Sequence, residues 1–328
     1  MKICVLGDLH FRTDLWWGGV AESFLSWFEK AEVGGILIQA GDVTDKDVNP
    51  GDTVDLVYRF AQICASKFEH TYILVGNHDR KLYKGRDQYS FKFLKRMDGI
   101  TVIEEPKIYD LHGVKTAMIP FVRTRGMTVD EYYESNLPKE FYSEEFDILV
   151  GHLAVKEKGT YYGGIDISKM KSKNYALGHI HSRPQASKFA KLYTGSIAPC
   201  KVDEDLTGDQ PRCIKIFEDA VLTEEVSIPR FMTYDSVTFP KEIPKTSDGL
   251  IHVYTVKGCK NLALARGFYK ESHIRGVEKS KKSDVEVSVG ERGKAFGSTR
   301  EAFSSMLKET GMKISRPVHK YVSDLLDL

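Results

Sequence analysis

Residues 36–45 read ILIQAGDVTD, a short apolar run that ends in a glycine and a cluster containing two aspartates. The same order occurs earlier, in KICVLGDLH at residues 2–10, and later, in YILVGNHD at residues 72–79. Apolar residues at helical spacing separate these runs, over residues 20–31 and again after Asp52, which is a suitable helix N-cap. This alternation predicts a β-α-β-α-β unit, in which crossover helices join parallel strands.

The middle of the chain contains further strand-like runs but fewer helical stretches. Residues 146–150 and 175–177 again precede Gly-His pairs, and strand-like residues 192–194 and 213–217 follow them. We therefore predict that residues 1–229 form one α/β domain.

A smaller unit is expected after residue 229. Residues 230–290 combine strand-like runs with one helical stretch, which predicts a small α+β domain, and the glycine-rich, charged residues 291–299 read as a linker. Residues 300–328 contain two helical stretches, and the amphipathic one after Pro317 suits core packing and partner docking equally well. The expected elements are strands at 234–239, 251–256 and 285–289 and helices at 261–268, 300–309 and 318–326.

Composition argues against several classes of protein. The net charge of +1 gives no general basic field of the kind that nucleic-acid binders show, although a local basic groove is compatible with it. The five cysteines form no CxxC pair, which disfavours a disulfide framework or a cysteine zinc site and favours small buried residues in a reducing cytosol. The first residues lack a signal-peptide pattern and no apolar run reaches about 18–20 residues, so we expect a soluble cytoplasmic protein without a membrane partner.

Five polar clusters each directly follow an apolar run. They are Gly7-Asp8-Leu9-His10, Gly41-Asp42-Val43-Thr44-Asp45, Gly76-Asn77-His78-Asp79, Gly151-His152 and Gly178-His179-Ile180-His181. In open α/β sheets, sites form at the carboxyl ends of strands, so clusters at five strand ends can converge on one point. A single Gly-His pair is more often structural, but five clusters in this order, with five of the ten histidines, indicate one site.

The residue types in these clusters suit divalent metals. Imidazole nitrogens mixed with carboxylate and amide oxygens fit manganese, iron or zinc better than calcium, which prefers oxygen alone. If one carboxylate bridges, seven side chains can hold two ions, and such a pair clamps a phosphoryl group during in-line attack. The predicted ligands of this two-metal phosphoesterase are Asp8, His10, Asp42, Asn77, His152, His179 and His181.

As a series, the five clusters resemble the motifs of the calcineurin-like metallophosphoesterases. Within that superfamily, the chain is similar to the nuclease subunit of the SbcCD double-strand-break repair complex, the meiotic-recombination nuclease family. Lys46 and Asp79 stand where protein serine/threonine phosphatases carry Arg and Glu, and the stretches NYALGHIHSRPQ (174–185) and YTGS (193–196) are typical of the nuclease branch. The resemblance implies a four-layer α/β/β/α sandwich with a small α+β capping domain and C-terminal helices.

The resemblance also implies a role for each site residue, with two Mn²⁺ per subunit and Mg²⁺ as the alternative. One metal would be held by Asp8, His10 and His181, the other by Asn77, His152 and His179, and both by a bridging Asp42. His78 would lie over the scissile phosphate and protonate the leaving oxygen, while Asp45 would orient His78 or, alternatively, cap a turn.

Basic and aromatic residues near the motifs are candidate DNA contacts. Those that follow the third motif are expected to lie near the metals and to contact phosphates; they are Arg80, Lys81, Lys84 and Arg86. In the expected capping domain, the residues that would be phosphate contacts or solvated surface are Lys270, Arg275, Lys279, Lys281 and Lys282. Trp16 and Trp17 would stack on bases or pack under their own loop.

The leading interpretation is a Mn-dependent DNA exonuclease and endonuclease that acts on double-stranded DNA ends in recombination, repair or DNA degradation. It would work as a homodimer with an SbcC-type coiled-coil ATPase bound by the helical tail. The compact chain would suit a virus-encoded enzyme acting in the host cytoplasm. Two alternatives stay open: a small-substrate phosphatase or cyclic-nucleotide phosphodiesterase of the same superfamily, which the near-neutral charge favours, and a non-catalytic scaffold.

Overall fold

A computed structural model describes most of the first 238 residues and short segments beyond them. The described residues are 1–13, 17–45, 50–83, 86–122, 129–156, 164–181, 189–198, 200, 213–238, 248, 250–257 and 273–278. They all belong to one compact unit, residues 1–280. The expected elements at 261–268, 285–289, 300–309 and 318–326, and the linker at 291–299, lie outside the described residues.

A six-stranded sheet carries the first three motifs. Its strands are β1 (Lys2–Leu6), β2 (Ile36–Gln39), β3 (His70–Leu74), β6 (Ile100–Ile103), β11 (Cys213–Glu218) and β12 (Val221–Ser227). They lie in the order β12-β11-β1-β2-β3-β6, in which the four strands from β1 to β6 are parallel and β11 and β12 are antiparallel additions. The predicted parallel β-α-β-α-β unit is therefore confirmed.

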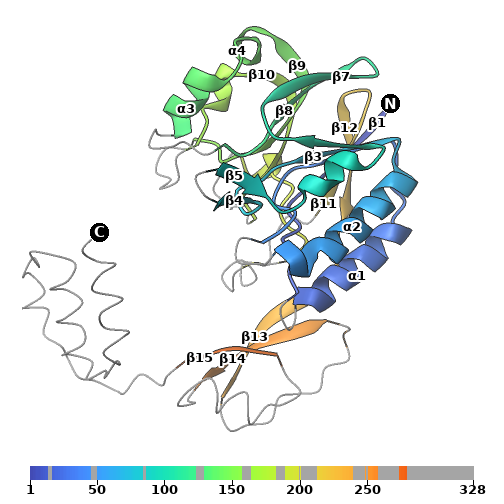
Figure 1. Ribbon diagram of the computed structural model, residues 1–328, viewed down its shortest axis with the longest axis vertical. Coiled ribbons are helices and arrows are strands. Elements are labelled where there is room, and N and C mark those ends of the chain that lie inside the picture. The colour runs from blue at the N-terminus through green and yellow to red at the C-terminus, as the bar shows by residue number, and fades with distance from the viewer. Residues whose placement is uncertain are drawn as a thin grey trace, which may run out of the picture. The chain divides into compact units, whose positions relative to one another are not determined.

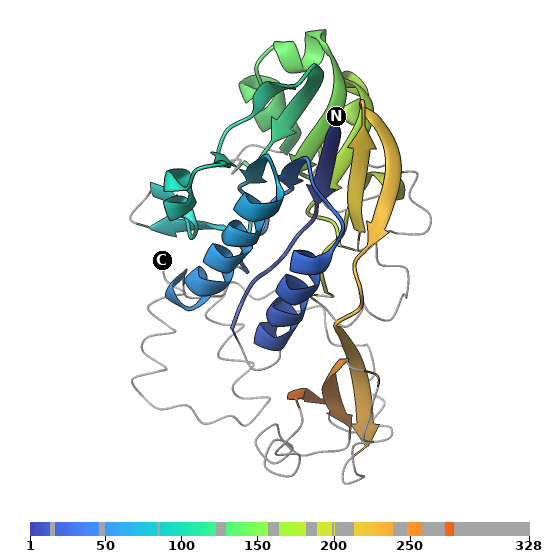
Figure 2. The same ribbon diagram turned by 90° about the vertical axis from the view of Figure 1, so that its right-hand side faces the viewer.

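Two long helices, α1 (Trp17–Lys30) and α2 (Pro50–Lys67), lie side by side on one face of this sheet (Figures 1 and 2). Phe24 and Phe28 of α1 recur one helical turn apart, so both rings point into the core, where Phe28 stacks on Phe60 of α2 with ring centroids 5.7 Å apart. Each such ring contributes about 1.5–3 kcal/mol through burial. This cluster fixes the helices onto the strands that carry the motifs.

A second sheet of four strands carries the last two motifs. Its order is β10 (Lys171–Gly178), β9 (Glu145–His152), β8 (Val114–Ile119) and β7 (Lys107–Leu111), with only β7 antiparallel to its neighbour. A second apolar cluster joins the two sheets, since it contains Val5 and Ile38 from the first sheet and Ile148 and Ala176 from the second. The two halves of the predicted site are thus carried by two sheets packed against each other.

The other face of the second sheet is covered by short helices. They are α3 (Val129–Asn136) and α4 (Glu140–Ser143), and Tyr133 and Phe141 from them pack against Phe146 and Leu149 of β9. A third apolar cluster therefore lies between this sheet and these helices. Short 3₁₀ turns elsewhere comprise η1 (Lys92–Arg96), η2 (Ile167–Lys169) and η3 (Ala190–Leu192).

Two small sheets complete the described elements. An antiparallel hairpin, β4 (Arg80–Tyr83) and β5 (Arg86–Tyr89), follows the third motif directly. A parallel three-stranded sheet comprises β13 (Met232–Thr238), β14 (Ile251–Lys257) and β15 (His273–Glu278). Met232 and Val253 of this sheet are buried in the same apolar cluster as α1, and the ring of Phe231 lies 6.4 Å from that of Phe24. The sheet is therefore anchored to α1.

Two local predictions were wrong. Helix α2 begins at Pro50, so Asp52 lies inside the first turn rather than at the N-cap; proline suits a first helical turn because that turn needs no intrahelical N–H donor. Residues 192–194 are not a strand: Leu192 ends a 3₁₀ turn and Tyr193 makes a single bridge to Leu177. No helix among the described residues combines the length and the apolar character that a membrane crossing needs.

Candidate metal centre

The ends of five strands from both sheets place the predicted ligands. Asp8 and His10 follow β1, Asp42 follows β2 and Asn77 follows β3 in the first sheet. In the second sheet, the final residue of β9 is His152, and β10 is followed by His179 and His181. All seven predicted ligands are among the described residues, and the structure brings them together in two overlapping clusters.

The backbone of these loops is unusual for the residues it carries. His10, Asp42 and His179 have φ angles of 47°, 53° and 83°, in the left-handed region that costs non-glycine residues about 1–3 kcal/mol each. The adjacent Gly76 and Gly178 approach the site so closely that an added Cβ would lie 2.1 Å from Asp42 Oδ1 and 2.5 Å from Asp8 Oδ1, respectively. The donors therefore leave no room for a side chain at positions 76 and 178. They also require a left-handed backbone at His10, Asp42 and His179.

The first cluster contains Asp8, His10, Asp42 and His181, with one ligand atom from each within 4.8 Å of the others. The Nε2 atoms of His10 and His181 lie 2.9 Å apart. His181 Nε2 is 3.0 Å from Asp8 Oδ2, and His10 Nε2 is 3.7 Å from Asp42 Oδ2. Two imidazole nitrogens and two carboxylates thus converge on one small volume.

The second cluster contains Asp42, His152 and His179. His152 Nε2 is 3.3 Å from Asp42 Oδ2, and Asn77 Oδ1 lies 2.8 Å both from this Nε2 and from His179 Nδ1. His152 Nδ1 donates to the carbonyl of Ala40 at 2.8 Å, so Nε2 is the ring atom that can bind a metal. Metal-binding histidines usually donate their other ring N–H to a carbonyl or carboxylate in this way. Asp42 belongs to both clusters, as a bridging carboxylate must.

Burial and mutual charge shift the pKa values of these groups. Burial lowers the pKa of His10 and, with the charge of His152, lowers the pKa of His179 to about 3. Burial also raises the pKa of Asp8. For Asp42, burial opposes ionisation, but the charges of His152 and His10 hold its pKa below the usual range. Burial likewise opposes the charge on His152, yet Asp42 and Asp8 raise its pKa to about 9.

This donor set fits a pair of divalent cations. Buried acids need compensating positive charge, and here two of them face imidazoles whose ring nitrogens point at the same space. The mixture of imidazole with carboxylate and amide oxygen is the set that first-row divalent ions accept. The sharing of Asp42 places the two positions next to each other.

His78 and Asp45 form a hydrogen-bonded pair beside the first cluster. His78 Nδ1 is 2.9 Å from Asp45 Oδ1, and the ring centroid of His78 lies 4.7 Å from that of His10. Burial opposes the charge on each group, but the interactions with neighbouring groups outweigh it. The pKa of Asp45 is lowered by His78 and Arg12, and that of His78 is raised by Asp45 and Asp42. Arg12, which donates from Nη1 to Asp45 Oδ2 at 2.7 Å, was not identified from the sequence. The sequence signal that could have identified Arg12 is its position two residues after the predicted ligand His10.

Buried polar side chains hold the motif loops in place. Asp79 accepts from the backbone N–H groups of Thr44 (2.8 Å) and Gly76 (2.7 Å), and burial together with Asp42 raises its pKa to about 7. Gln39 donates from Nε2 to the carbonyls of Gly7 (3.0 Å) and Gly41 (2.7 Å) and accepts from Gly41 N–H through Oε1 (3.0 Å). The first three motifs are therefore tied to one another by two fully buried side chains, neither of which the sequence singled out as a tie.

The segment after η3, which contains the YTGS stretch (193–196), is hydrogen-bonded to the first motif. Asp8 N–H donates to the carbonyl of Gly195 at 3.0 Å, and Ile197 N–H donates to the carbonyl of Asp8 at 3.0 Å. A Cβ on Gly7 would lie 2.0 Å from that Gly195 carbonyl oxygen, so only glycine fits there. The YTGS stretch thus packs directly against the backbone of the first motif.

The predicted DNA contacts are only partly described. Arg80 donates from Nη2 to the carbonyl of Glu104 at 2.8 Å, which holds its guanidinium against that loop. The remaining predicted contacts, or their side chains, lie outside the described residues; they are Trp16, Trp17, Lys81, Lys84, Arg86, Lys270, Arg275, Lys279, Lys281 and Lys282.

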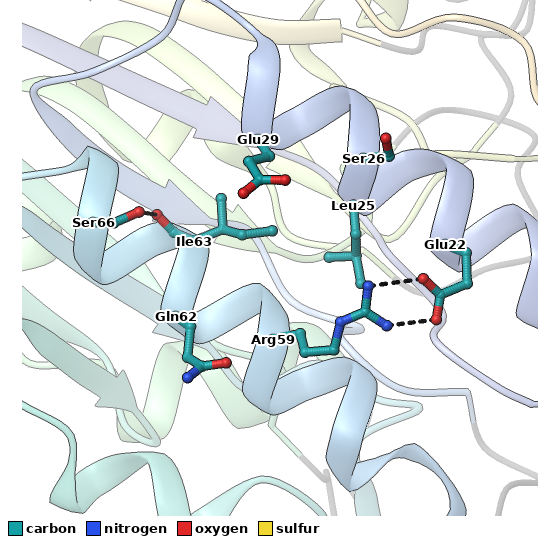
Figure 3. A pocket seen from close by; sticks show the side chains of 8 residues that line it. All are labelled: Glu22, Leu25, Ser26, Glu29, Arg59, Gln62, Ile63 and Ser66. Carbon is teal, nitrogen blue, oxygen red and sulfur yellow. Dashed lines mark hydrogen bonds and ion pairs between the residues drawn. The ribbon is translucent and has the colours of Figure 1, made fainter.

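A hollow of about 510 Å³ between α1 and α2 is separate from the centre (Figure 3). Its lining includes Glu22, Arg59, Gln62 and Ile63, and an ion pair between Arg59 and Glu22 crosses it. None of its lining residues is a predicted site residue.

Of the comparisons with known proteins, the match to a family model agrees with this geometry. No curated protein matches the chain. Solved structures with a partial likeness include a protein of unknown function from Aquifex aeolicus (13% identity, 52% of this chain and 87% of that chain, TM-score 0.32). Another is a hypothetical protein from Thermus thermophilus (11% identity, 69% of this chain and 97% of that chain, TM-score 0.36). The calcineurin-like phosphoesterase model matches residues 1–183, more than half of the 328 residues. The chain belongs to the calcineurin-like phosphoesterase family.

Proposed function

We propose that this protein is a Mn-dependent DNA exonuclease and endonuclease that hydrolyses phosphodiester bonds at a two-metal centre. Family membership establishes metal-dependent phosphoester hydrolysis as the general chemistry. The observation that carries the proposal for this chain is the pair of donor clusters that share Asp42, with the His78–Asp45 pair beside them. The proposed ligands are the six residues of the two clusters together with Asn77.

The roles of the residues follow from their contacts. Two bound cations would supply Lewis-acid polarisation of the phosphoryl group and activation of water. Asp42 would set the spacing of the two positions because one carboxylate serves both clusters. His78 would donate a proton to the leaving oxygen from Nε2, since its Nδ1 is directed at Asp45 and its raised pKa favours the protonated ring. Arg12 would keep Asp45 ionised and in place.

The DNA substrate is supported by what surrounds the centre. The nuclease-type stretch YTGS underlies Asp8, and a separate three-stranded sheet, β13–β15, follows the core and packs on α1. We propose that this sheet is part of a capping domain at residues 230–290, that the three apolar clusters reflect a four-layer arrangement, and that the tail after residue 290 binds an SbcC-type ATPase in a homodimeric complex. A small-substrate phosphodiesterase needs none of these additions, although the net charge of +1 favours it.

Paired substrates test the proposal. The full chain, with and without a co-expressed ATPase partner, is assayed on a linear DNA duplex and on a chromogenic phosphodiester, with Mn²⁺ or Mg²⁺. We expect Mn-dependent cleavage of the duplex that His78→Ser abolishes. Turnover of the chromogenic ester alone would identify a small-substrate enzyme. Tight association with the ATPase and no hydrolysis of either substrate would identify a scaffold.

A further inference from the structure

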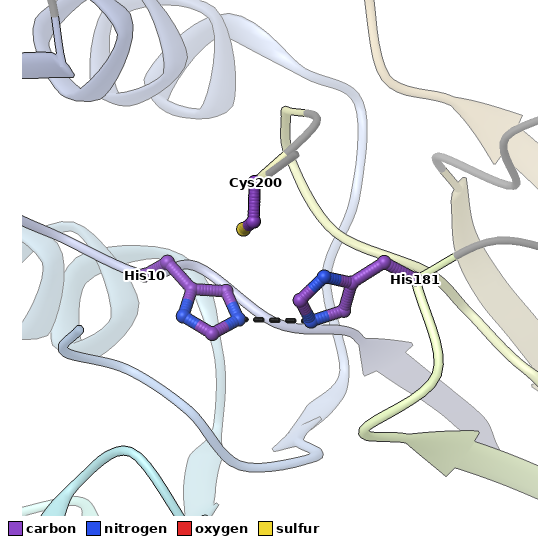
Figure 4. Close-up of side chains that lie close together, drawn as sticks. All are labelled: His10, His181 and Cys200. Carbon is purple, nitrogen blue, oxygen red and sulfur yellow. Dashed lines mark hydrogen bonds between the residues drawn. The ribbon is translucent and has the colours of Figure 1, made fainter. Parts of the chain in front are cut away.

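Cys200 lies beside the first donor cluster (Figure 4). Its sulfur, one nitrogen of His10 and one nitrogen of His181 all lie within 4.8 Å of one another, and the sulfur is turned toward the two rings. Cys200 is half-buried and His10 is 1% exposed, so the thiol lies at the boundary between solvent and the buried cluster. Composition led us to expect a small buried residue here, and the fold places a potential ligand instead.

Two observations besides the thiol point to a ligand at this place. The His10 and His181 Nε2 atoms are only 2.9 Å apart, and they would open to roughly 3.3 Å around a tetrahedral ion with nitrogen bonds of about 2.0–2.1 Å. The ring of His10 is also not fixed by an outer partner, because its buried Nδ1 has no hydrogen-bond partner within the described part of the chain. This differs from His152, which Ala40 fixes. His10 can therefore adjust toward an ion that the thiol shares.

We propose that Cys200 supplies a thiolate ligand to the metal position of His10 and His181, so that this position binds thiophilic cations such as Zn²⁺, Co²⁺ or Cd²⁺ more tightly than it would without the thiol, while its affinity for Mn²⁺ stays nearly the same. Soft thiolate donors strengthen binding of such ions far more than binding of Mn²⁺, which prefers oxygen. On coordination, the thiol loses its proton to solvent and forms one sulfur–metal bond, with no change of oxidation state. This inference rests on the proposed two-metal centre.

The other described cysteines differ from Cys200. Cys4, Cys64 and Cys213 are buried, and burial raises the pKa of the Cys4 thiol to about 11 and that of the Cys64 thiol further still. Neither Cys4 nor Cys64 belongs to a donor cluster among the described residues. Cys64 is therefore a suitable control position, since its loss removes a thiol without touching the centre.

Cobalt spectroscopy tests the proposal without relying on activity. The metal-free, reduced full chain is titrated with Co²⁺, and the visible d–d bands and the near-ultraviolet thiolate-to-cobalt charge-transfer band are recorded for wild type, Cys200→Ser and Cys64→Ala. We expect both kinds of band in wild type and in Cys64→Ala, and d–d bands alone in Cys200→Ser. Competition titrations should show Zn²⁺ and Cd²⁺ affinity about 10–100-fold lower in Cys200→Ser, comparable with the loss of other ligand-supporting groups. Mn²⁺ affinity should change by less than about threefold.

The outcomes separate this inference from the proposed function. Co²⁺ binding with d–d bands and no charge-transfer band in wild type would overturn the role of Cys200 and leave the two-metal centre standing. A charge-transfer band that persists in Cys200→Ser would assign the thiolate to another cysteine and also overturn it. If wild type binds neither Co²⁺ nor Mn²⁺, the centre itself is absent and both conclusions fail.

Discussion

Gln39→Met tests whether one buried amide holds two metal-binding loops together. Gln39 ends β2, is completely buried and contacts the backbone of both Gly7 and Gly41, each of which directly precedes a proposed ligand. Methionine has a similar length and fills similar space, but it neither donates nor accepts strongly. The substitution therefore removes the hydrogen bonds with little change in packing.

The expected cost follows from the three hydrogen bonds. Two carbonyls and one N–H would lose the amide as partner, and a buried polar group left unsatisfied costs about 1–3 kcal/mol. With partial relaxation of the glycines, we expect the free energy of unfolding to fall by roughly 3–6 kcal/mol, out of a typical total of about 5–15 kcal/mol. Because the loops of Asp8 and Asp42 lose a common anchor, metal affinity should also fall by about 10–100-fold.

Urea denaturation of the metal-free protein measures the first effect, and metal competition titration measures the second. Gln62→Met is the matched control, since it makes the same chemical change at an exposed position of α2 and should alter stability by less than about 0.5 kcal/mol. A loss below about 1 kcal/mol in Gln39→Met, or a loss equal to that of the control, would refute the anchoring role.

Three further predictions concern the centre itself. Asp42→Ala should abolish hydrolysis and lower the bound metal to less than one ion per chain by elemental analysis, since Asp42 belongs to both clusters; normal cleavage would contradict the site assignment. His78→Ser should retain both metals but lose about 10²–10⁴-fold in rate, whereas loss of metal would make His78 a ligand. Metal affinity should rise with pH, by about tenfold per unit from His152 alone, because its pKa of about 9 keeps the metal-free ring protonated at neutral pH and a ligand must be neutral. Calorimetry in buffers of different ionisation enthalpy would detect the released proton, and an affinity independent of pH between about 7 and 8 would count against this.

Much of the fold could be predicted because strands and ligand positions are local properties of the sequence. The apolar runs before Asp8, Asp42 and Asn77 were short and continuous, as strands buried on both faces must be, and the intervening helical spacing implied parallel pairing. The edges of helices were less certain, as Pro50 at the start of α2 showed, because capping residues such as Asp52 occur in first turns as well as at caps.

The sequence by itself determined which residues follow strand ends, and hence the identity of the candidate donors. Only the tertiary structure decided that these strands belong to two sheets, and that packing of Val5 and Ile38 against Ile148 brings His152 and His181 toward Asp8 and Asp42. The tertiary structure also decided which residues outside the five motifs contact the site, namely Gln39 and Cys200. The physical reason is that strand periodicity is encoded within a few residues, whereas these contacts join positions up to about 190 residues apart and exist only once the sheets have packed.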